Sequence, residues 1–256
     1  MRPEDFWAAG SLVDAYVAQS GALAYEVEAI TRAVSRAERS GSAKAIHVIG
    51  VGSGRELPAI RAAAPHARIR ASDISEPMVE ACRQFVERQG IANVVVELSD
   101  AADLDRGDAD EAADVVIALG AVLGYSTTPT LQRAVLTAFG ALLRPGGSVV
   151  LVVQQRYGRP DWAAWFAGRA VLATVTGGHL GTTTGNRASR HESSSVVFHH
   201  YTRSELRSQL AQSGFDDVAI MSLRQWGRAD RRRIPLRSPN PLITIASFLP
   251  GDRPRP

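Results

Sequence analysis

Apolar and polar positions change their spacing along the chain, and each change marks a different kind of element. Residues 3–39 carry apolar side chains near helical spacing, interrupted around Ser20 and Gly21, so we expect helices there. From residue 45 onward, short apolar runs alternate with helical segments. The pattern predicts strands at residues 45–50, 67–72, 94–98, 115–119 and 148–153, and helices that end at residue 64, span residues 76–89 and span residues 130–143.

This alternation predicts the fold class. The runs at residues 115–119 and 148–153 are apolar throughout, as strands covered on both faces are. Strands that alternate with helices form βαβ units and a mostly parallel sheet. We therefore expect an α/β, Rossmann-like sheet of seven strands with helices on both faces.

The C-terminal part of the chain interrupts the alternation and then resumes it. Residues 154–195 carry Trp162, Trp165 and Phe166, and a stretch of this length in such a fold is usually a functional lid or cap. A helix over residues 202–213 follows. Its predicted capping residues are Thr202 and Glu205, which form a capping box, and Gly214. Two strands, residues 218–223 and 242–249, are expected to close the sheet as an antiparallel hairpin.

These elements suggest five regions. They are an N-terminal helical lid (1–40), a nucleoside-binding core (41–153), a substrate-cap insertion (154–200), the C-terminal helix and strands (201–250) and a tail (251–256).

Composition and charge exclude several function classes. The chain has 256 residues, 45% hydrophobic and 21% charged, which is typical of a globular protein. The formal charge of +3 is small for this length, and the one dense basic cluster is Arg231–Arg233, so a nucleic-acid partner is not expected. The single cysteine, Cys82, excludes an internal disulfide and a Cys-rich zinc site. An acidic N-terminus and the lack of a long apolar run predict a cytoplasmic protein without a membrane partner.

A glycine-rich loop follows the first strand of the core. Gly50, Gly52 and Gly54 let the chain turn sharply and let a ligand lie against bare backbone at a helix N-terminus. A dinucleotide fold needs a further glycine at position 55, where this chain has Arg55. The loop therefore favours a ligand other than a dinucleotide.

Two acids follow the next two strands. Asp73 ends the second strand about 20 residues after the glycines, and Asp100 follows the third. Because the carboxyl ends of parallel strands meet at one edge, both acids and Gly52 should line one crevice. Carboxylates accept hydrogen bonds from ribose hydroxyls and an amine but repel a pyrophosphate. The pattern favours a cationic or zwitterionic nucleoside.

At these residues the chain resembles the class I S-adenosylmethionine-dependent methyltransferases. The resemblance covers residues 45–153 continuously and the C-terminal strands less specifically. Its motifs are Ile49-Gly50-Val51-Gly52-Ser53-Gly54, Ala71-Ser72-Asp73-Ile74-Ser75-Glu76-Pro77-Met78, Leu98-Ser99-Asp100-Ala101-Ala102-Asp103-Leu104, Asp114-Val115-Val116-Ile117-Ala118-Leu119, Leu142-Leu143-Arg144-Pro145-Gly146-Gly147-Ser148 and Tyr201-Thr202-Arg203-Ser204-Glu205-Leu206 with Ser213-Gly214-Phe215.

The resemblance implies S-adenosylmethionine as cofactor and S-adenosylhomocysteine as product. The family usually has an acid two residues before the first glycine, at the amino end of the cofactor, whereas this chain has Val48 there, with His47 beside it. The residues implied to contact the cofactor are Gly50, Gly52 and Gly54 at the methionine, Asp73 with Ile74 at the ribose, Asp100 with Ala101 at the adenine, and Leu119 close to the sulfonium.

Methyl transfer from a sulfonium mainly requires positioning and desolvation of the acceptor, with a base for some nitrogen or oxygen acceptors. Our candidates for the catalytic role are His199, His200 and, from the lid, Tyr16. The alternatives are polar strand-end residues for the histidines and core packing for the tyrosine. No metal-ligand set is evident in the sequence.

The leading hypothesis is methyl transfer to an N, O or C atom of a small molecule, in biosynthesis such as secondary metabolism. A second hypothesis, suggested by Val48, is an enzyme that binds the cofactor but catalyses a cyclisation or rearrangement. A third is an RNA-binding or regulatory protein that uses Arg231–Arg233. The sequence leaves a homodimer open.

Overall fold

The computed structural model of the chain describes most of its length. The described residues are 6–7, 13–14, 17–18, 21–38, 43–104, 112–178, 185–191, 194–229 and 240–249.

Seven strands of the described part form one sheet in the order β3-β2-β1-β4-β5-β9-β8. The neighbours from β3 to β5 pair in parallel, whereas β9 runs antiparallel to both β5 and β8. The order reverses beside β1, which lies between β2 and β4, and ligands bind at such switch points. The strands are β1 (Ala45–Ile49), β2 (Arg68–Asp73), β3 (Val94–Leu98), β4 (Ala113–Ala118), β5 (Leu143–Val153), β8 (Phe215–Ser222) and β9 (Leu242–Phe248).

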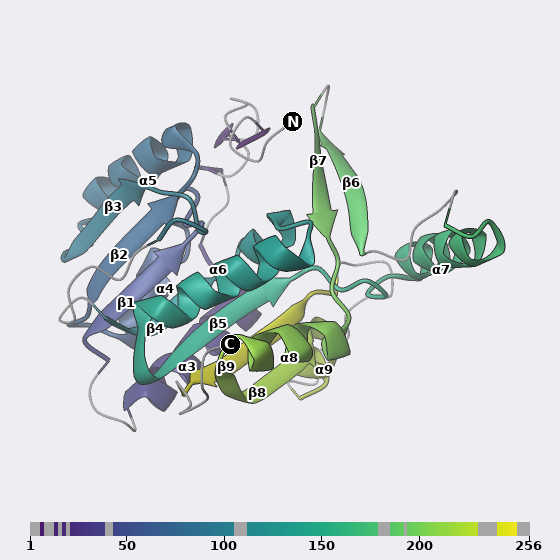
Figure 1. The fold of residues 1–256 in the computed structure, drawn as a ribbon. Coiled ribbons are helices and arrows are strands. Elements are labelled where there is room, and N and C mark those ends of the chain that lie inside the picture. The colour runs from purple at the N-terminus through teal and green to yellow at the C-terminus, as the bar shows by residue number, and fades with distance from the viewer. Residues whose placement is uncertain are drawn as a thin grey trace.

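Helices cover both faces of this sheet, because its strands are apolar on both sides. One buried cluster joins Val48 of β1 to Ile30 and Ile60 of two helices, and another joins Val116 of β4 to Phe139. In Figure 1 helix α6 crosses in front of β4 and β5. The helices are α3 (Ala24–Glu38), α4 (Leu57–Ala63), α5 (Glu76–Gln89), α6 (Pro129–Leu142), α7 (Pro160–Val175), α8 (Arg203–Gln212) and α9 (Leu223–Ala229), with the 3-10 helix η2 (Val122–Tyr125) after β4.

The helix ends follow local chemistry. Thr202 accepts a hydrogen bond from the backbone N–H of Glu205, and the Glu205 side chain accepts one from the N–H of Thr202, which confirms the predicted capping box. Gly214 follows the C-cap residue with a φ of 85°. Thr128 caps α6 in a similar way, accepting from the N–H of Leu131.

The predicted fold class is confirmed, and two local predictions need correction. The strand predicted at residues 148–153 begins earlier, at Leu143, so residues 144–147 belong to β5, and Gly146 has a φ of 81° there. The link between β8 and β9, expected as a plain hairpin loop, begins with helix α9 directly after β8.

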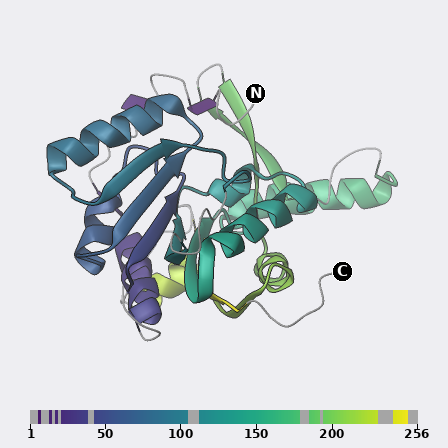
Figure 2. The ribbon, with the colours of Figure 1, turned by 60° about the vertical axis from the view of Figure 1, so that its left-hand side comes forward.

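The insertion contains regular structure that its irregular pattern did not predict. It holds helix α7 and an antiparallel hairpin of β6 (Asn186–His191) and β7 (Ser194–His199). Helix α7 extends away from the sheet in both views (Figures 1 and 2). The helix exposes Val171 and Val175, while Phe166 and Ala173 are its buried residues. None of the helices in the described ranges combines the length and apolar character that a membrane span requires.

Two helical glycines offer a matched test of the packing. A Cβ added at Gly140 of α6 would lie 2.6 Å from Cε2 of Phe248, whereas one at Gly168 of α7 would meet nothing within 4 Å. Gly140→Ala should therefore lower the free energy of unfolding by about 1–3 kcal/mol through overpacking. Gly168→Ala should raise it by about 0.5–1 kcal/mol, because alanine is the better helix former. Urea denaturation of both variants measures this, and equal effects of the two substitutions would contradict the packing of α6 on β9.

Candidate functional site

The turn between β1 and α4 is built by its glycines. Gly50, Gly52 and Gly54 all have positive φ angles, of 67°, 53° and 86°. The backbone N–H groups of Gly50 and Val51 donate to the carbonyl oxygen of Ser72, at 2.8 and 3.0 Å, which ties the turn to β2. A Cβ at Gly50 would lie 2.3 Å from Cγ2 of Val122, so any side chain here would be strained and would clash.

Asp73 ends β2 and holds two turns of the sheet edge together. Its Oδ2 accepts a hydrogen bond from the N–H of Gly52 at 2.8 Å, and its Oδ1 accepts one from the N–H of Ser75 at 2.9 Å. Burial raises the pKa of this carboxyl, and the hydrogen bonds from Ser75 and Gly52 act against that shift. The carboxylate still has acceptor capacity beyond these two bonds, because its two oxygens offer about four lone-pair sites.

A cavity of about 260 Å³ lies at this edge of the sheet. Six of the residues expected to contact the cofactor line it: Gly50, Gly52, Asp73, Ile74, Asp100 and Ala101. Asp100 is exposed, and its Oδ1 accepts from the N–H of Ala102 at 2.8 Å. The remaining lining residues are Trp7, Ile49, Met78, Ser99, Ala102, Gly120, Val122, Tyr125, Ser126, Leu131 and Val135.

Gly54 and Leu119, also expected at the cofactor, are not among the cavity-lining residues. A Cβ on Gly54 would point at Sγ of Cys82, 2.9 Å away, so this glycine allows the loop to pack closely on α5. Leu119 is buried in the same core cluster as Val48. These two residues act on the cavity through the backbone and through packing.

Val48, which stands where the family usually has an acid, faces the apolar core. Its side chain is buried in the apolar cluster beneath α3. His47 is buried too, and burial, with the nearby charge of Arg70, lowers its pKa to about 4. Neither residue lines the cavity.

Arg55 connects the glycine turn to helix α3. Its guanidinium binds the carboxylate of Glu26 through two hydrogen bonds, of 2.7 and 2.8 Å, and Glu26 also accepts from the N–H of Leu23 at 2.8 Å. Glu26 is buried and the Arg55 side chain is 13% exposed. Arg55, which stands where a dinucleotide fold would have a glycine, therefore holds helix α3 against the glycine turn.

Glu56 lies next in the chain and is buried. Burial raises its pKa to about 8, against the opposing effect of the Arg55 charge, and the nearby charges of Glu26 and Asp73 raise it further. The side chain therefore takes up a proton at higher pH than an exposed glutamate does.

The two candidate histidines lie outside the cavity lining. The ring nitrogens of His199 lie 2.8 Å from Oδ1 of Asn186 and 2.8 Å from Oε1 of Glu205. Oε2 of Glu205 accepts from Arg156 at 2.7 Å. Burial by itself would raise the pKa of the Glu205 carboxyl. The hydrogen bond from His199 and the charge of Arg156 outweigh burial, so the pKa of Glu205 is lowered. This network joins the insertion to the capping box of α8.

His200 is packed within the insertion. Its ring centroid lies 4.9 Å from that of Trp162 and 5.4 Å from that of Phe166, and burial lowers its pKa to about 4. Trp162 and Trp165, which the sequence places in the predicted substrate cap, are also outside the cavity lining.

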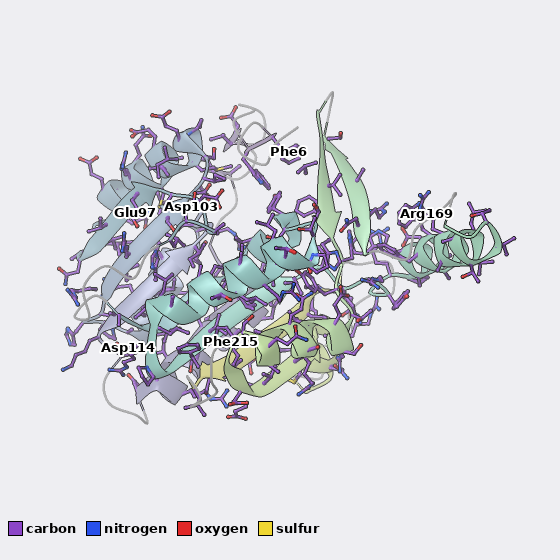
Figure 3. The ribbon with its side chains drawn as sticks, viewed as in Figure 1. Phe6, Glu97, Asp103, Asp114, Arg169 and Phe215 are labelled. Carbon is purple, nitrogen blue, oxygen red and sulfur yellow. The ribbon has the colours of Figure 1, made fainter. Side chains whose placement is uncertain are left out.

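Arginine side chains surround these tryptophans. Arg187 lies 5.4 Å over the Trp162 ring, and Arg169 lies 5.2 Å over the Trp165 ring. Figure 3 places Arg169 on the projecting helix α7. The aromatic rings of the insertion contact one another around the buried Phe166, while Trp165 is 37% exposed. Tyr16 and Arg231–Arg233 lie outside the described residues.

Sequence reasoning missed Trp7 and Tyr125. Tyr125 follows β4, and strand order alone places that loop at the same edge as Asp73, so topology could have indicated it. No sequence pattern singles out Trp7, because its position depends on contacts with distant segments. No cluster of three or more metal-ligating side chains occurs in the described ranges.

A family model matches the part of the chain that carries the glycine turn, Asp73 and Asp100. Residues 46–147 match the family model described as a methyltransferase domain. No curated protein sequence matches the chain at a significant level.

Several solved structures share the fold. The CcbJ methyltransferase from Streptomyces caelestis is 17% identical, with a TM-score of 0.62 over 95% of this chain and 98% of that chain. Magnesium protoporphyrin IX methyltransferase (ChlM) from Synechocystis PCC 6803, a structure with bound SAH, is 17% identical, with a TM-score of 0.58 over 96% and 97%. A S-adenosylmethionine-dependent methyltransferase from Clostridium acetobutylicum is 10% identical, with a TM-score of 0.61 over 89% and 93%.

The buried carboxyl of Glu56 predicts a pH-dependent stability. A carboxyl whose pKa rises from about 4.5 to about 8 on folding contributes stability that is complete below pH 4.5 and is lost as the pH rises through 8. Glu56→Gln stays neutral, so the melting temperature of this variant minus that of the wild type should be more positive at pH 8.5 than at pH 5. The pKa shifts of His47 and His200 occur in both the variant and the wild type. Their contributions therefore cancel when the two melting temperatures are subtracted.

Thermal melts of both proteins across this range measure the effect. Glu80→Gln, on the exposed surface of α5, controls for the removal of one negative charge. A difference between Glu56→Gln and wild type that does not change with pH would contradict the burial of a protonated Glu56.

Proposed function

We propose that residues 46–147, which match the methyltransferase-domain family model, form a class I S-adenosylmethionine-dependent methyltransferase domain, and that the chain transfers a methyl group from S-adenosylmethionine to a small-molecule acceptor. The observation that carries this proposal is the meeting of the glycine turn, Asp73 and Asp100 in one cavity whose remaining wall is mostly apolar.

The residues present fit the cofactor. The positive φ angles of Gly50 and Gly52 leave bare backbone where the methionine part would lie, and a Cβ at Gly50 would occupy space already taken by Val122. Asp73, oriented by two backbone N–H groups, would accept from the ribose hydroxyls. Asp100 at the end of β3 would accept from the adenine amine, with the apolar Ile74 beside it.

When bound, S-adenosylmethionine supplies a methyl group on a positively charged sulfur. The carboxylates of Asp73 and Asp100 suit such a cationic ligand electrostatically. The buried apolar residues of the wall, such as Ile49 and Val135, would keep water from the acceptor. In this proposal the side chains mainly position and desolvate the two reactants, and His199 and His200 have structural roles in the insertion.

A second candidate function rests on Val48. Valine has no carboxylate, and the Val48 side chain is buried in the apolar core, so this position supplies no acid at the amino end of the cofactor. A cyclisation or rearrangement that leaves the cofactor unconsumed therefore remains the competing proposal. Measuring S-adenosylhomocysteine formation per turnover separates the two, because only methyl transfer produces it.

Binding of S-adenosylhomocysteine tests the cofactor site directly. We expect isothermal titration to show binding to the wild type and a roughly 10- to 100-fold weaker affinity for Asp73→Ala, since that change removes charged hydrogen-bond acceptors. Asp216→Ala, an exposed acid on strand β8 at the opposite edge of the sheet, is the matched control and should bind like the wild type. A folded wild-type protein that does not bind would overturn the proposal.

A further inference from the structure

An aromatic cluster joins three distant parts of the chain beside the cavity. Its members are Phe6 and Trp7 of the N-terminal segment, Tyr125 of the 3-10 helix η2 after β4, and Val196 and Phe198 of β7. Figure 3 shows Phe6 beside the β6–β7 hairpin. These segments are far apart in sequence and meet here because the contact buries Phe6 and Val196 against the other apolar side chains.

The rings in this cluster meet edge to face or tilted. The centroids of Trp7 and Tyr125 are 6.2 Å apart at an interplanar angle of 74°, and those of Tyr125 and Phe198 are 4.5 Å apart at 48°. Phe6 packs on Trp7 from behind, at 5.3 Å and 89°. Trp7 and Tyr125 are half-buried and line the cavity, so each can offer surface to a ligand while the other rings support it.

The backbone of Trp7 is fixed to the turn that holds Asp73. The hydroxyl of Ser75 donates to the carbonyl oxygen of Trp7 at 3.1 Å, and the N–H of Ser75 donates to Asp73 at 2.9 Å. One residue therefore connects the proposed ribose acid to the aromatic wall. This connection places Trp7 at the side of the cavity next to the cofactor residues.

The rest of the wall favours an uncharged, flat ligand. Among the described residues that line the cavity, the ionisable side chains are Asp73, Asp100 and Tyr125. The two aspartates belong to the proposed cofactor site. The groups left for an acceptor are two aromatic rings, the small residues Gly120 and Ser126, and aliphatic side chains. Ring-to-ring contacts prefer an aromatic ligand over a saturated one of equal size.

We propose that Trp7 and Tyr125, whose rings contact each other edge to face, form one aromatic wall of the cavity that selects a planar aromatic acceptor. This inference rests on the proposed function, because it assigns the part of the cavity that the cofactor leaves open. In it, Trp7 and Tyr125 determine specificity through their ring faces and edges, and Ser75 is a positioning residue that holds the backbone of Trp7.

The test compares two ligands that differ in aromaticity. The probes are 2-naphthol and decahydro-2-naphthol, titrated into protein saturated with S-adenosylhomocysteine and followed by calorimetry. We expect 2-naphthol to bind the wild type about tenfold more tightly than its saturated analogue. Trp7→Ala should bring this ratio close to one, Trp7→Phe should keep most of it, and the affinity for S-adenosylhomocysteine should change less than threefold in both.

Two further variants make the test specific. Trp165→Ala removes a partly exposed tryptophan of α7 outside the cavity lining and should leave the ratio unchanged. Tyr125→Leu removes the second ring of the aromatic wall. It should reduce the ratio of the two affinities even if Trp7→Ala proves unstable in a thermal melt.

The outcomes separate this inference from the proposed function. Absence of S-adenosylhomocysteine binding to the wild type refutes the proposed function itself. If that product binds but 2-naphthol does not, or if both alcohols bind equally well, the proposed role of the aromatic wall is overturned. It is also overturned if Trp7→Ala weakens S-adenosylhomocysteine binding and leaves the ratio of the two alcohol affinities intact, because Trp7 would then cover only the cofactor.

Discussion

The carboxylate of Asp73 is the interaction on which the site depends. It accepts hydrogen bonds from the turn after β1, through Gly52, and from the turn after β2, through Ser75. This carboxylate thus adds a side-chain link between two loops that the backbone hydrogen bonds of Gly50 and Val51 to Ser72 also join. Ser75 extends the same connection to the backbone of Trp7. Asp73 and Ser75 thus connect the glycine turn to the aromatic wall of the cavity.

The glycine turn is held from its other side by a buried ion pair. Arg55 and Glu26 form two hydrogen bonds with little exposure to water, and breaking such a pair by removing one partner leaves an uncompensated charge. The pair anchors α3 to the turn, so the N-terminal helix belongs to the structure of the site. The neighbouring Glu56 adds a second carboxyl to this buried group, and burial raises the pKa of Glu56 although the charge of Arg55 acts against that shift.

The insertion combines aromatic contacts around Phe166 with a network of charges that joins it to the sheet. His199 lies between Asn186 and Glu205, and Glu205 also pairs with Arg156. The same glutamate completes the capping box of α8, so the start of that helix and the base of the hairpin share one residue. His199 was a candidate base because of its residue type. Both of its ring nitrogens have partners here, so the side chain connects two parts of the fold.

The sequence by itself determined the alternation of strands and helices, the glycine turn and the acids at the ends of β2 and β3. These features are local: a period of apolar residues or a glycine after a strand has the same meaning in any context, and strand order then brings the acids to one edge. Only the tertiary structure decided that Trp7 meets Tyr125, that Val48 faces the core and that His199 and His200 lie outside the cavity. Those outcomes depend on contacts between residues far apart in the chain, which no local pattern records.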